Sequence, residues 1–297
     1  MVATSEALRT PLRVSPFKRF IASGRWFLLI PLTIITVMVA TAVLAEWLTP
    51  YSPTEISLSN RLRPPFWENG GSLAHPLGTD PMGRDLLTRM IYGARVSLLV
   101  AALALLVGGG IGAALGLIAG YHGGRVDAFI MRVADTTMAF PIILFAILFV
   151  VIIGGSLTTT VFAVALVLWA RYARVIRGEV LSLRERDFVA QARVAGCSSA
   201  RIIMVHLFPN IVNTLVVLLS LQVGWVIIVE ASLSFLGAGI PPPTPTWGSM
   251  IAEGRDYIAT AWWVSFFPGL AILVTVLSFN LFGDWLRDAL DPKLRQM

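Results

Sequence analysis

The chain has 297 residues, of which 56% are hydrophobic and only 13% are charged, a composition that excludes an ordinary soluble domain and is typical of a membrane protein built from several helices. The net charge of +6 does not indicate nucleic-acid binding, because the basic residues lie beside apolar runs and not on one solvated patch. The single cysteine, Cys197, excludes an internal disulfide and a cysteine metal cluster, and the three scattered histidines form no metal-binding pattern.

The N-terminal segment, residues 1–25, is basic and precedes an uncharged run. Ala40 and Ala42 in that run resemble a signal-peptide cleavage site. The run is longer than the core of a signal peptide, however, and its basic lead is also long. We therefore predict a retained first transmembrane helix over 26–48, and a cleaved signal peptide is the less favoured alternative.

Five further apolar stretches follow, which gives an all-α integral membrane fold with six transmembrane helices. They cover about 94–119, 130–153, 157–176, 205–233 and 260–283. The uncharged run of the fourth span is short, but this span can cross the bilayer if the side chains of Arg171 and Arg174 extend to the membrane interface.

Most arginines and lysines lie in the two terminal segments and in the loops on the same side of the membrane as the termini. Because cytoplasmic segments carry an excess of these residues, both termini are predicted to be cytoplasmic. In this topology 49–93 is an extracytoplasmic loop, 94–283 is a core of five spans, and 284–297 is a cytoplasmic tail.

The outer loop carries the motif GTDPMGRD, which includes Asp80, Arg84 and Asp85. It is typical of a turn that leads into a helix. These side chains could contact a partner protein. The alternative is structural, with Asp80 capping the helix and Arg84 pairing with a carboxylate.

The second span has a glycine at every fourth position, which leaves one helix face without side chains. These glycines are Gly108, Gly112, Gly116 and Gly120. The pattern favours close packing inside the bundle over a subunit interface or a sliding surface, but it does not identify the partner helix. Pro141 and Pro209 mark kinks or helix boundaries.

A charged island over 171–209 interrupts the apolar pattern, with seven arginines against three acidic residues between 171 and 201. Its arginine excess places it on the cytoplasmic side. A helix over 187–196 would have one face of mostly small residues, which favours docking into a groove of another protein over lying on anionic lipid. That face comprises Phe188, Val189, Ala192, Ala195 and Gly196.

Catalytic motifs are absent from the sequence. The only lysines, Lys18 and Lys293, are not preceded by the glycines of a phosphate-binding loop, and there is no GxSxG or HExxH motif. Energy for any work must therefore come from a partner or an ion gradient.

The island resembles the EAA loop of binding-protein-dependent ABC importer permeases, with Gly196 and Pro209 at the spacing of that pattern. Ala190 stands where glutamate is usual and Gln191 where the middle alanine is usual. Four long motifs resemble the "C"-type subunit of the dipeptide/oligopeptide/nickel permease branch. They cover 78–98, 116–141, 230–258 and 267–295.

The resemblance implies a type I ABC importer permease fold in a bacterial inner membrane, with a coupling helix at about 184–200 between the fourth and fifth spans. It also implies a second related permease, two cytoplasmic ATPases that hold ATP and Mg²⁺, and an extracytoplasmic binding protein, with no cofactor on this chain. Asp80, Arg84 and Asp85 are then candidates for contact with the binding protein. The coupling contacts carried over by position are Phe188, Val189, Ala192, Arg193, Gly196 and Cys197. At Gly196, a helix seated in a groove would leave no room for a side chain.

Polar groups in or near the spans are candidates for the translocation pathway, because burying them is costly. They are Asp135, Gln222, Glu230, Asn280 and Asp284. Asp135 and Asp284 lie near predicted helix ends and could be interfacial. Glu230 could line the outer mouth or face the loop.

The favoured function is a non-catalytic permease subunit that forms half of a pathway for short peptides, and import of nickel or another small solute is the alternative within the branch. An intramembrane protease using Asp284 and Asp135 is disfavoured, because Phe282-Gly283-Asp284 misses the GxGD pattern. A gradient-driven transporter would show an internal repeat and mid-span charges, and neither is visible.

Overall fold

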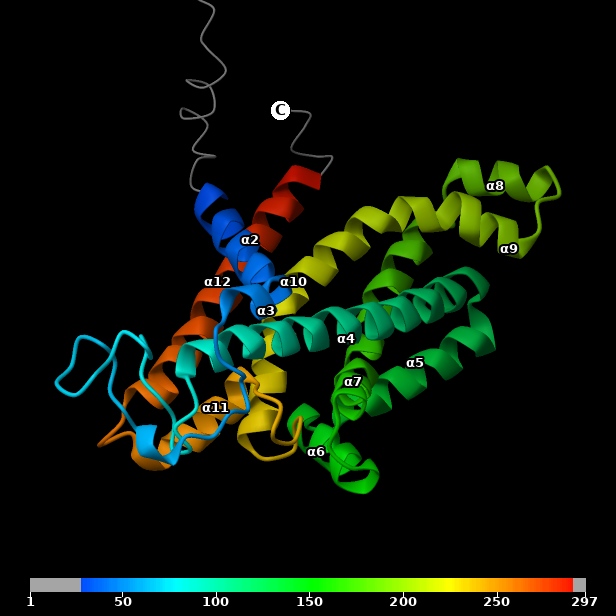
Figure 1. Ribbon diagram of the computed structural model, residues 1–297. Coiled ribbons are helices and arrows are strands. Elements are labelled where there is room, and N and C mark those ends of the chain that lie inside the picture. Colours follow the sequence, from blue (N-terminus) through cyan, green and yellow to red (C-terminus); the bar gives the residue numbers. More distant parts are fainter. Residues whose placement is uncertain (1–27, 291–297) are drawn as a thin grey trace, which may run out of the picture.

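The computed structural model describes residues 28–290, and apart from two isolated bridges the regular elements in that range are helices (Figure 1). The long helices are α2 (Leu29–Val43), α4 (Leu86–His122), α5 (Gly124–Ala139), α6 (Ile142–Ile153), α7 (Leu157–Leu183), α10 (Phe208–Phe235) and α12 (Trp263–Leu290). The short ones are α3 (Ala45–Leu48), η2 (Leu58–Asn60), α8 (Asp187–Val194), α9 (Ser199–Arg201), the π-helical turn η3 (Ile202–Leu207), α11 (Trp247–Gly254) and η4 (Arg255–Tyr257).

Four helical stretches within 28–290 are long and apolar enough to cross a membrane: α4, α7, the continuous stretch Ser199–Phe235, and α12. They contain the second, fourth and fifth predicted spans, and α12 covers the sixth from Trp263 onward. The first predicted span begins outside the described residues, and its described part is the shorter apolar helix α2. The core is also longer than predicted, because α4 begins at Leu86 and α12 continues to Leu290 into the predicted tail.

The third predicted span, 130–153, is wrong as a single straight helix. It is divided into α5 and α6, which meet at a bend of 92°. Phe140 is extended, because the residue before a proline is disfavoured in helical geometry, and Pro141 is the N-cap residue immediately before α6. The sequence marked Pro141 as a kink or boundary but did not predict the size of the bend.

The glycines of α4 pack against α7, which identifies the helix that the sequence left open. A Cβ at Gly108 would lie 2.9 Å from the Ala165 carbonyl oxygen, and one at Gly116 would lie 2.6 Å from that of Ala173. Gly112 and Gly120 meet the same helix. The packing interpretation is therefore confirmed, and this face is occupied inside the chain.

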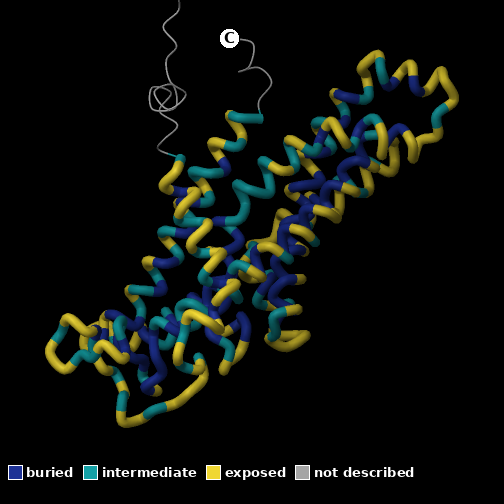
Figure 2. Tube along the Cα trace, turned by 45° about the horizontal axis from the view of Figure 1, so that its top comes forward, coloured by how far each residue is buried: buried dark blue, intermediate teal, exposed yellow. Residues whose placement is uncertain are grey.

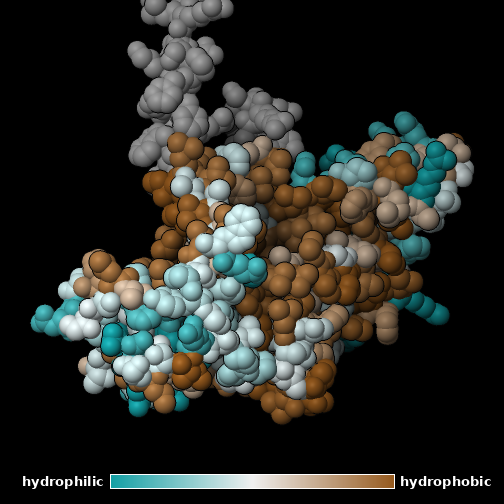
Figure 3. Space-filling view, viewed as in Figure 1, coloured by the Kyte–Doolittle hydropathy of each residue, from teal (hydrophilic) through white to brown (hydrophobic). Residues whose placement is uncertain are grey.

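The molecule has polar regions at two opposite parts and an apolar middle (Figure 3). The loop before α4 forms one polar part and the α8 region forms the other, while buried residues follow α4 and α7 through the centre (Figure 2). In Figure 1 the first turn of α2 and the last turn of α12 lie toward the same side as α8. An apolar middle between polar ends suits a bilayer.

Candidate functional site

The helix of the charged island, α8, is short and ends at Val194, two residues before Gly196. Gly196 has a φ of +77°, a left-handed conformation that side-chain-bearing residues rarely adopt. The backbone N–H of Gly196 donates to the Arg193 carbonyl at 3.0 Å, and that of Cys197 donates to the Ala192 carbonyl at 3.0 Å. These bonds satisfy the last carbonyls of the helix, as glycine-terminated helices commonly do.

Within this chain a Cβ at Gly196 would meet no atom within 4 Å, so the predicted lack of room in the groove of a partner stays a prediction. The glycine is needed for its backbone conformation. Replacement by alanine at a left-handed position costs about 1–2 kcal/mol.

The predicted docking face of α8 is only partly accessible, because two of its residues pack on the chain itself while Ala195 and Gly196 are exposed. Val189 is fully buried, and Ala192 is buried beside it. Both belong to a hydrophobic cluster with Ile176 of α7 and Leu207 of η3, and Phe188 and Cys197 pack against this cluster. The small-residue face thus holds α8 on its own chain, because small side chains permit close approach.

The opposite face of α8 is the exposed one. Val194 is 91% exposed, and Ala190 and Gln191, which depart from the EAA pattern, are exposed as well. Arg193 is exposed, with its guanidinium 5.5 Å from the centre of the Tyr121 ring. We define the exposed residues Ala190, Gln191, Arg193 and Val194 as the α8 surface.

Gly196→Ala is expected to loosen the end of α8, because the left-handed backbone becomes strained. Trypsin cleavage at Arg193 and Arg201 should accelerate by about fivefold, which corresponds to about 1 kcal/mol of local opening. The matched control is Gly178→Ala, at an open position inside α7 without a positive φ. Equal cleavage of both variants and of the parent chain would contradict this role of Gly196.

Ion pairs join α5 to α7 near the α8 region. Arg177 donates through Nε and Nη2 to the two carboxylate oxygens of Asp127, at 2.7 and 2.6 Å. Arg174 pairs with Asp135 across the same two helices through a single contact, from Nη2 to Oδ1. Asp135 therefore lies in an exposed ion pair between α5 and α7, which favours its interfacial interpretation over a place in the pathway.

The outer motif forms a buried charge network, which corrects the predicted contact with a binding protein. Asp80 is fully buried, Arg84 is 4% exposed and Asp85 is 5% exposed. Arg84 donates to Asp80 at 2.5 Å and to Glu253 of α11 at 2.7 Å. Arg89, 2% exposed, bridges the same two acids. The structural alternative is the one observed.

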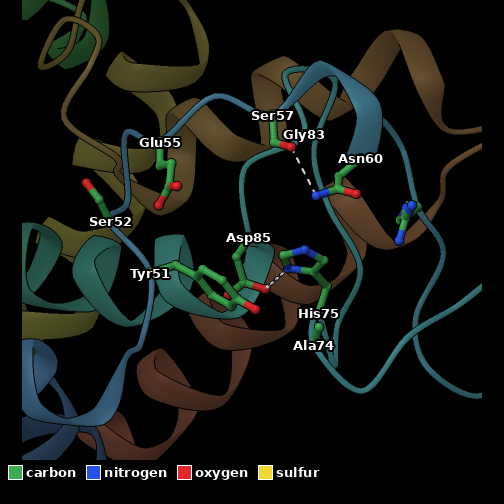
Figure 4. Close-up of a pocket in the computed structure, with 10 residues that line it drawn as sticks. Tyr51, Ser52, Glu55, Ser57, Asn60, Ala74, His75, Gly83 and Asp85 are labelled. Atoms are coloured by element: carbon green, nitrogen blue, oxygen red, sulfur yellow. Dashed lines mark hydrogen bonds and ion pairs between the residues drawn. The ribbon is translucent and has the colours of Figure 1, made fainter.

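The cap of α4 is Asp85 and not Asp80, since the Asp85 carboxylate accepts from the Thr88 N–H at 2.8 Å. His75 Nδ1 lies 3.0 Å from the other Asp85 oxygen. Figure 4 shows this contact at a cavity of about 290 Å³ between loop segments, with the Tyr51 ring beside His75. These contacts join the loop before α4 to the first turn of that helix.

Glu230 lies in the core, which corrects the prediction of a mouth or loop position. It is fully buried, and its carboxylate accepts from Ser97 of α4 at 2.9 Å and from Ser234 at 2.8 Å. The hydrogen bonds satisfy a group that would be costly to bury without partners, and they tie α10 to α4.

The other pathway candidates lie apart from Glu230. Gln222 is half-buried on α10, and Asn280 and Asp284 are exposed on α12. Their part in a pathway stays a prediction.

Sequence reasoning missed Glu179, which lies near the end of α7. Its Oε1 accepts from Thr214 of α10 at 3.0 Å. Its Oε2 is buried without a hydrogen-bond partner among residues 28–290. The sequence showed Glu179 only as one of three acids in the island, and its position after three arginines gave no sign that it turns inward.

Comparison with known proteins identifies a family of transport proteins. Residues 112–296 match the family of binding-protein-dependent transport system inner membrane components. The "Dipeptide transport system permease protein DppC" of Escherichia coli (strain K12) is 43% identical over 300 residues, covering 99% of both chains. The "Di/tripeptide transport system permease protein DppC" of Pseudomonas aeruginosa (strain UCBPP-PA14) is 44% identical over 264 residues, covering 89% of this chain and 87% of the relative.

A solved structure shares the fold. It is the MetNI methionine ABC transporter in an inward-facing conformation, with a TM-score of 0.53 at 17% sequence identity. The match covers 69% of this chain and 96% of the MetNI chain. At this identity the likeness concerns the fold alone.

Proposed function

Because the chain belongs to the family of binding-protein-dependent transport system inner membrane components, we propose that it is the permease subunit that carries short peptides across the inner membrane. The observation that carries this proposal is the 43% identity to a dipeptide permease over 99% of both chains. The apolar middle of the molecule and its four long apolar helices are consistent with a membrane pathway.

In the proposed topology the α8 end faces the cytoplasm, with the arginines of the island on that side. Six passages would then comprise α2, extended toward the N-terminus, together with α4, the bent pair α5 and α6, α7, Ser199–Phe235 and α12. The termini would be cytoplasmic, since the described ends of α2 and α12 lie toward the α8 side.

The energy source is proposed to be a pair of cytoplasmic ATPases, which would hold ATP and Mg²⁺, while this chain binds neither. Their contact would be the α8 surface, because the other face of α8 is buried against α7 and η3. Val194, which is 91% exposed, gives this surface an apolar side chain beside polar ones. A second related permease and an extracytoplasmic binding protein would complete the transporter.

The proposed function is tested by purifying the chain from its native membrane and identifying the chains that accompany it. We expect a related permease and two ATP-binding chains. In liposomes, with the binding protein outside, this complex should take up labelled dialanine only when ATP is supplied. A chain that transports a solute alone, or a complex that rejects dipeptides, would contradict the proposal.

Val194→Asp is expected to weaken ATPase binding about tenfold or more, because the α8 surface would lose its apolar contact and gain a charge. Ile258→Asp is the matched control, since Ile258 is also exposed, at 58%, but lies in the loop before α12. Copurification of the ATPases measures the effect, and both variants should retain the thermal stability of the parent chain. Equal ATPase recovery with both variants would exclude the α8 surface as the contact.

A further inference from the structure

A cavity of about 470 Å³ is lined by residues of α7, α10 and α12: the last turns of α7 and α12 and the first half of α10. Glu179 lines it from α7, and Arg287 and Leu290 line it from α12. The α10 residues on its wall are Asn210, Asn213, Thr214, Val217, Leu218 and Leu221. This volume is within the range of small-molecule sites, which is roughly 300–1,000 Å³.

The cavity holds one carboxylate whose hydrogen-bonding capacity is only half used. Thr214 occupies Oε1 of Glu179, whereas Oε2 is buried and unpartnered within residues 28–290. Buried polar atoms nearly always have a partner, so an atom of this kind requires an explanation. A ligand that donates to Oε2 would provide one.

A cationic side chain lines the same cavity. Arg287 is exposed and forms no ion pair with another residue of the described range. A guanidinium is suited to a carboxylate, because its planar N–H groups match two oxygens. The cavity therefore presents a negative and a positive group on two different helices, α7 and α12.

We infer that this cavity is a binding site for short peptides in their zwitterionic form, with the α-ammonium group at Glu179 and the terminal carboxylate at Arg287. The inference rests on the proposed function and adds a site to it. The amides of Asn210 and Asn213 would bind the peptide bond, and Val217, Leu218 and Leu221 would contact the ligand's side chains.

The chemistry favours a zwitterion over a divalent cation. Glu179 is the single carboxylate among the described lining residues, and no group of three or more metal-ligating residues occurs in the described range. A zwitterion needs a partner at each end, since an unpaired charge is costly to hold away from water. This cavity supplies both partners at once.

The site also lies close to the energy-coupling region. Glu179 belongs to the last turns of α7, and the chain reaches α8 shortly after that helix ends at Leu183. A peptide bound at Glu179 would therefore occupy the last part of the path before release on the α8 side.

Site-directed labelling tests the inference in the purified complex with its partner chains and without the binding protein. In the Cys197→Ser background this chain has no cysteine, so Val217→Cys places its single thiol on the cavity wall, and labelling is measured on this chain after the subunits are separated. An uncharged maleimide reports access to that thiol. Dialanine, N-acetyl-dialanine and dialanine amide are the three probes, because the last two each lack one terminal charge.

Dialanine is expected to slow labelling several-fold at saturation. In Glu179→Gln its half-protecting concentration should rise about tenfold or more, since a charge-assisted hydrogen bond is lost. N-acetyl-dialanine should protect as weakly in the parent as in Glu179→Gln. Arg287→Gln should remove the difference between dialanine and its amide. Asp288→Asn, at an exposed position of α12 outside the cavity lining, is the matched control, and dialanine should protect it as it protects the parent.

Two results would overturn the inference: equal protection by all three probes, or protection in Glu179→Gln that equals the parent. Glutamine keeps an acceptor for Thr214, and gel filtration of each complex identifies variants that fail to assemble. If the intact complex imports dialanine but dialanine gives no protection, the site is wrong and the proposed function stands. If the complex does not import dialanine, the proposed function itself fails.

Discussion

Arg89→Met is expected to destabilise the chain by about 3–5 kcal/mol, because it removes one cation from a buried network of two arginines and two acids. Arg89 donates to Glu253 through Nη1 and Nη2, at 2.6 and 3.0 Å, and it pairs with Asp80 as well. With methionine at this position, both carboxylates would share Arg84 alone, and Asp80 is fully buried.

The network joins segments that are far apart in the sequence. Arg89 and Glu253 are separated by 164 residues, and their contact fastens α11 to the start of α4. Loss of Arg89 should therefore lower the temperature at which the detergent-solubilised protein unfolds, as measured by fluorescence-detected gel filtration after heating.

Arg255→Met is the matched control for Arg89→Met. Arg255 pairs with Asp256, and the two side chains are 59% and 74% exposed. An ion pair of this kind contributes about 0–1 kcal/mol, since water screens both charges. Similar losses of stability in the two variants would contradict the structural role of the outer network.

Gly112→Leu is expected to cost about 3 kcal/mol or more, or to prevent stable folding, because α4 and α7 have no space for a side chain at this point. A Cβ at Gly112 would lie 2.4 Å from the Trp169 carbonyl oxygen and 2.6 Å from the Tyr172 Cβ. The first of these atoms is backbone, so α7 itself would have to move.

Gly110→Leu separates this steric effect from helix propensity. Gly110 lies on the same helix, two residues away, and a Cβ there would meet no atom within 4 Å. Leucine is a better helix former than glycine by roughly 0.5–1 kcal/mol, so this variant should equal the parent or exceed it in stability. Equal unfolding temperatures for both leucine variants would contradict the prediction, because they would show that α4 and α7 can move apart to admit a side chain at Gly112.

The positions of the long helices could be predicted because hydropathy is a local property. An apolar run longer than about eighteen residues must satisfy its backbone groups within one helix, whatever lies beside it. For that reason α4, α7, α10 and α12 all lie where the sequence placed spans. The 92° bend at Pro141 was not predictable, because a proline in a membrane helix can produce either a mild kink or a break.

The candidate sites were predicted less well, and α8 shows the reason. Its periodicity separated a small-residue face from an arginine-bearing face, but it did not say which of them packs on the chain. The packing partners of Val189 and Ala192 include Ile176 of α7 and Leu207 of η3, and their approach depends on how those helices meet. The positive φ of Gly196 was likewise not visible in the sequence, and its predicted fit in the groove of a partner stays a prediction.

The sequence by itself determined that this is a helical membrane protein of the ABC importer permease family, which lacks a nucleotide-binding loop of its own. Composition is read directly from the sequence, and each apolar run and each motif lies within one segment of the chain. Only the tertiary structure decided that Asp80 and Arg84 are buried, that the glycines of α4 meet α7, and that Glu179 and Arg287 line one cavity. These facts depend on contacts between distant segments, and such contacts follow from how the helices pack, which no single segment encodes.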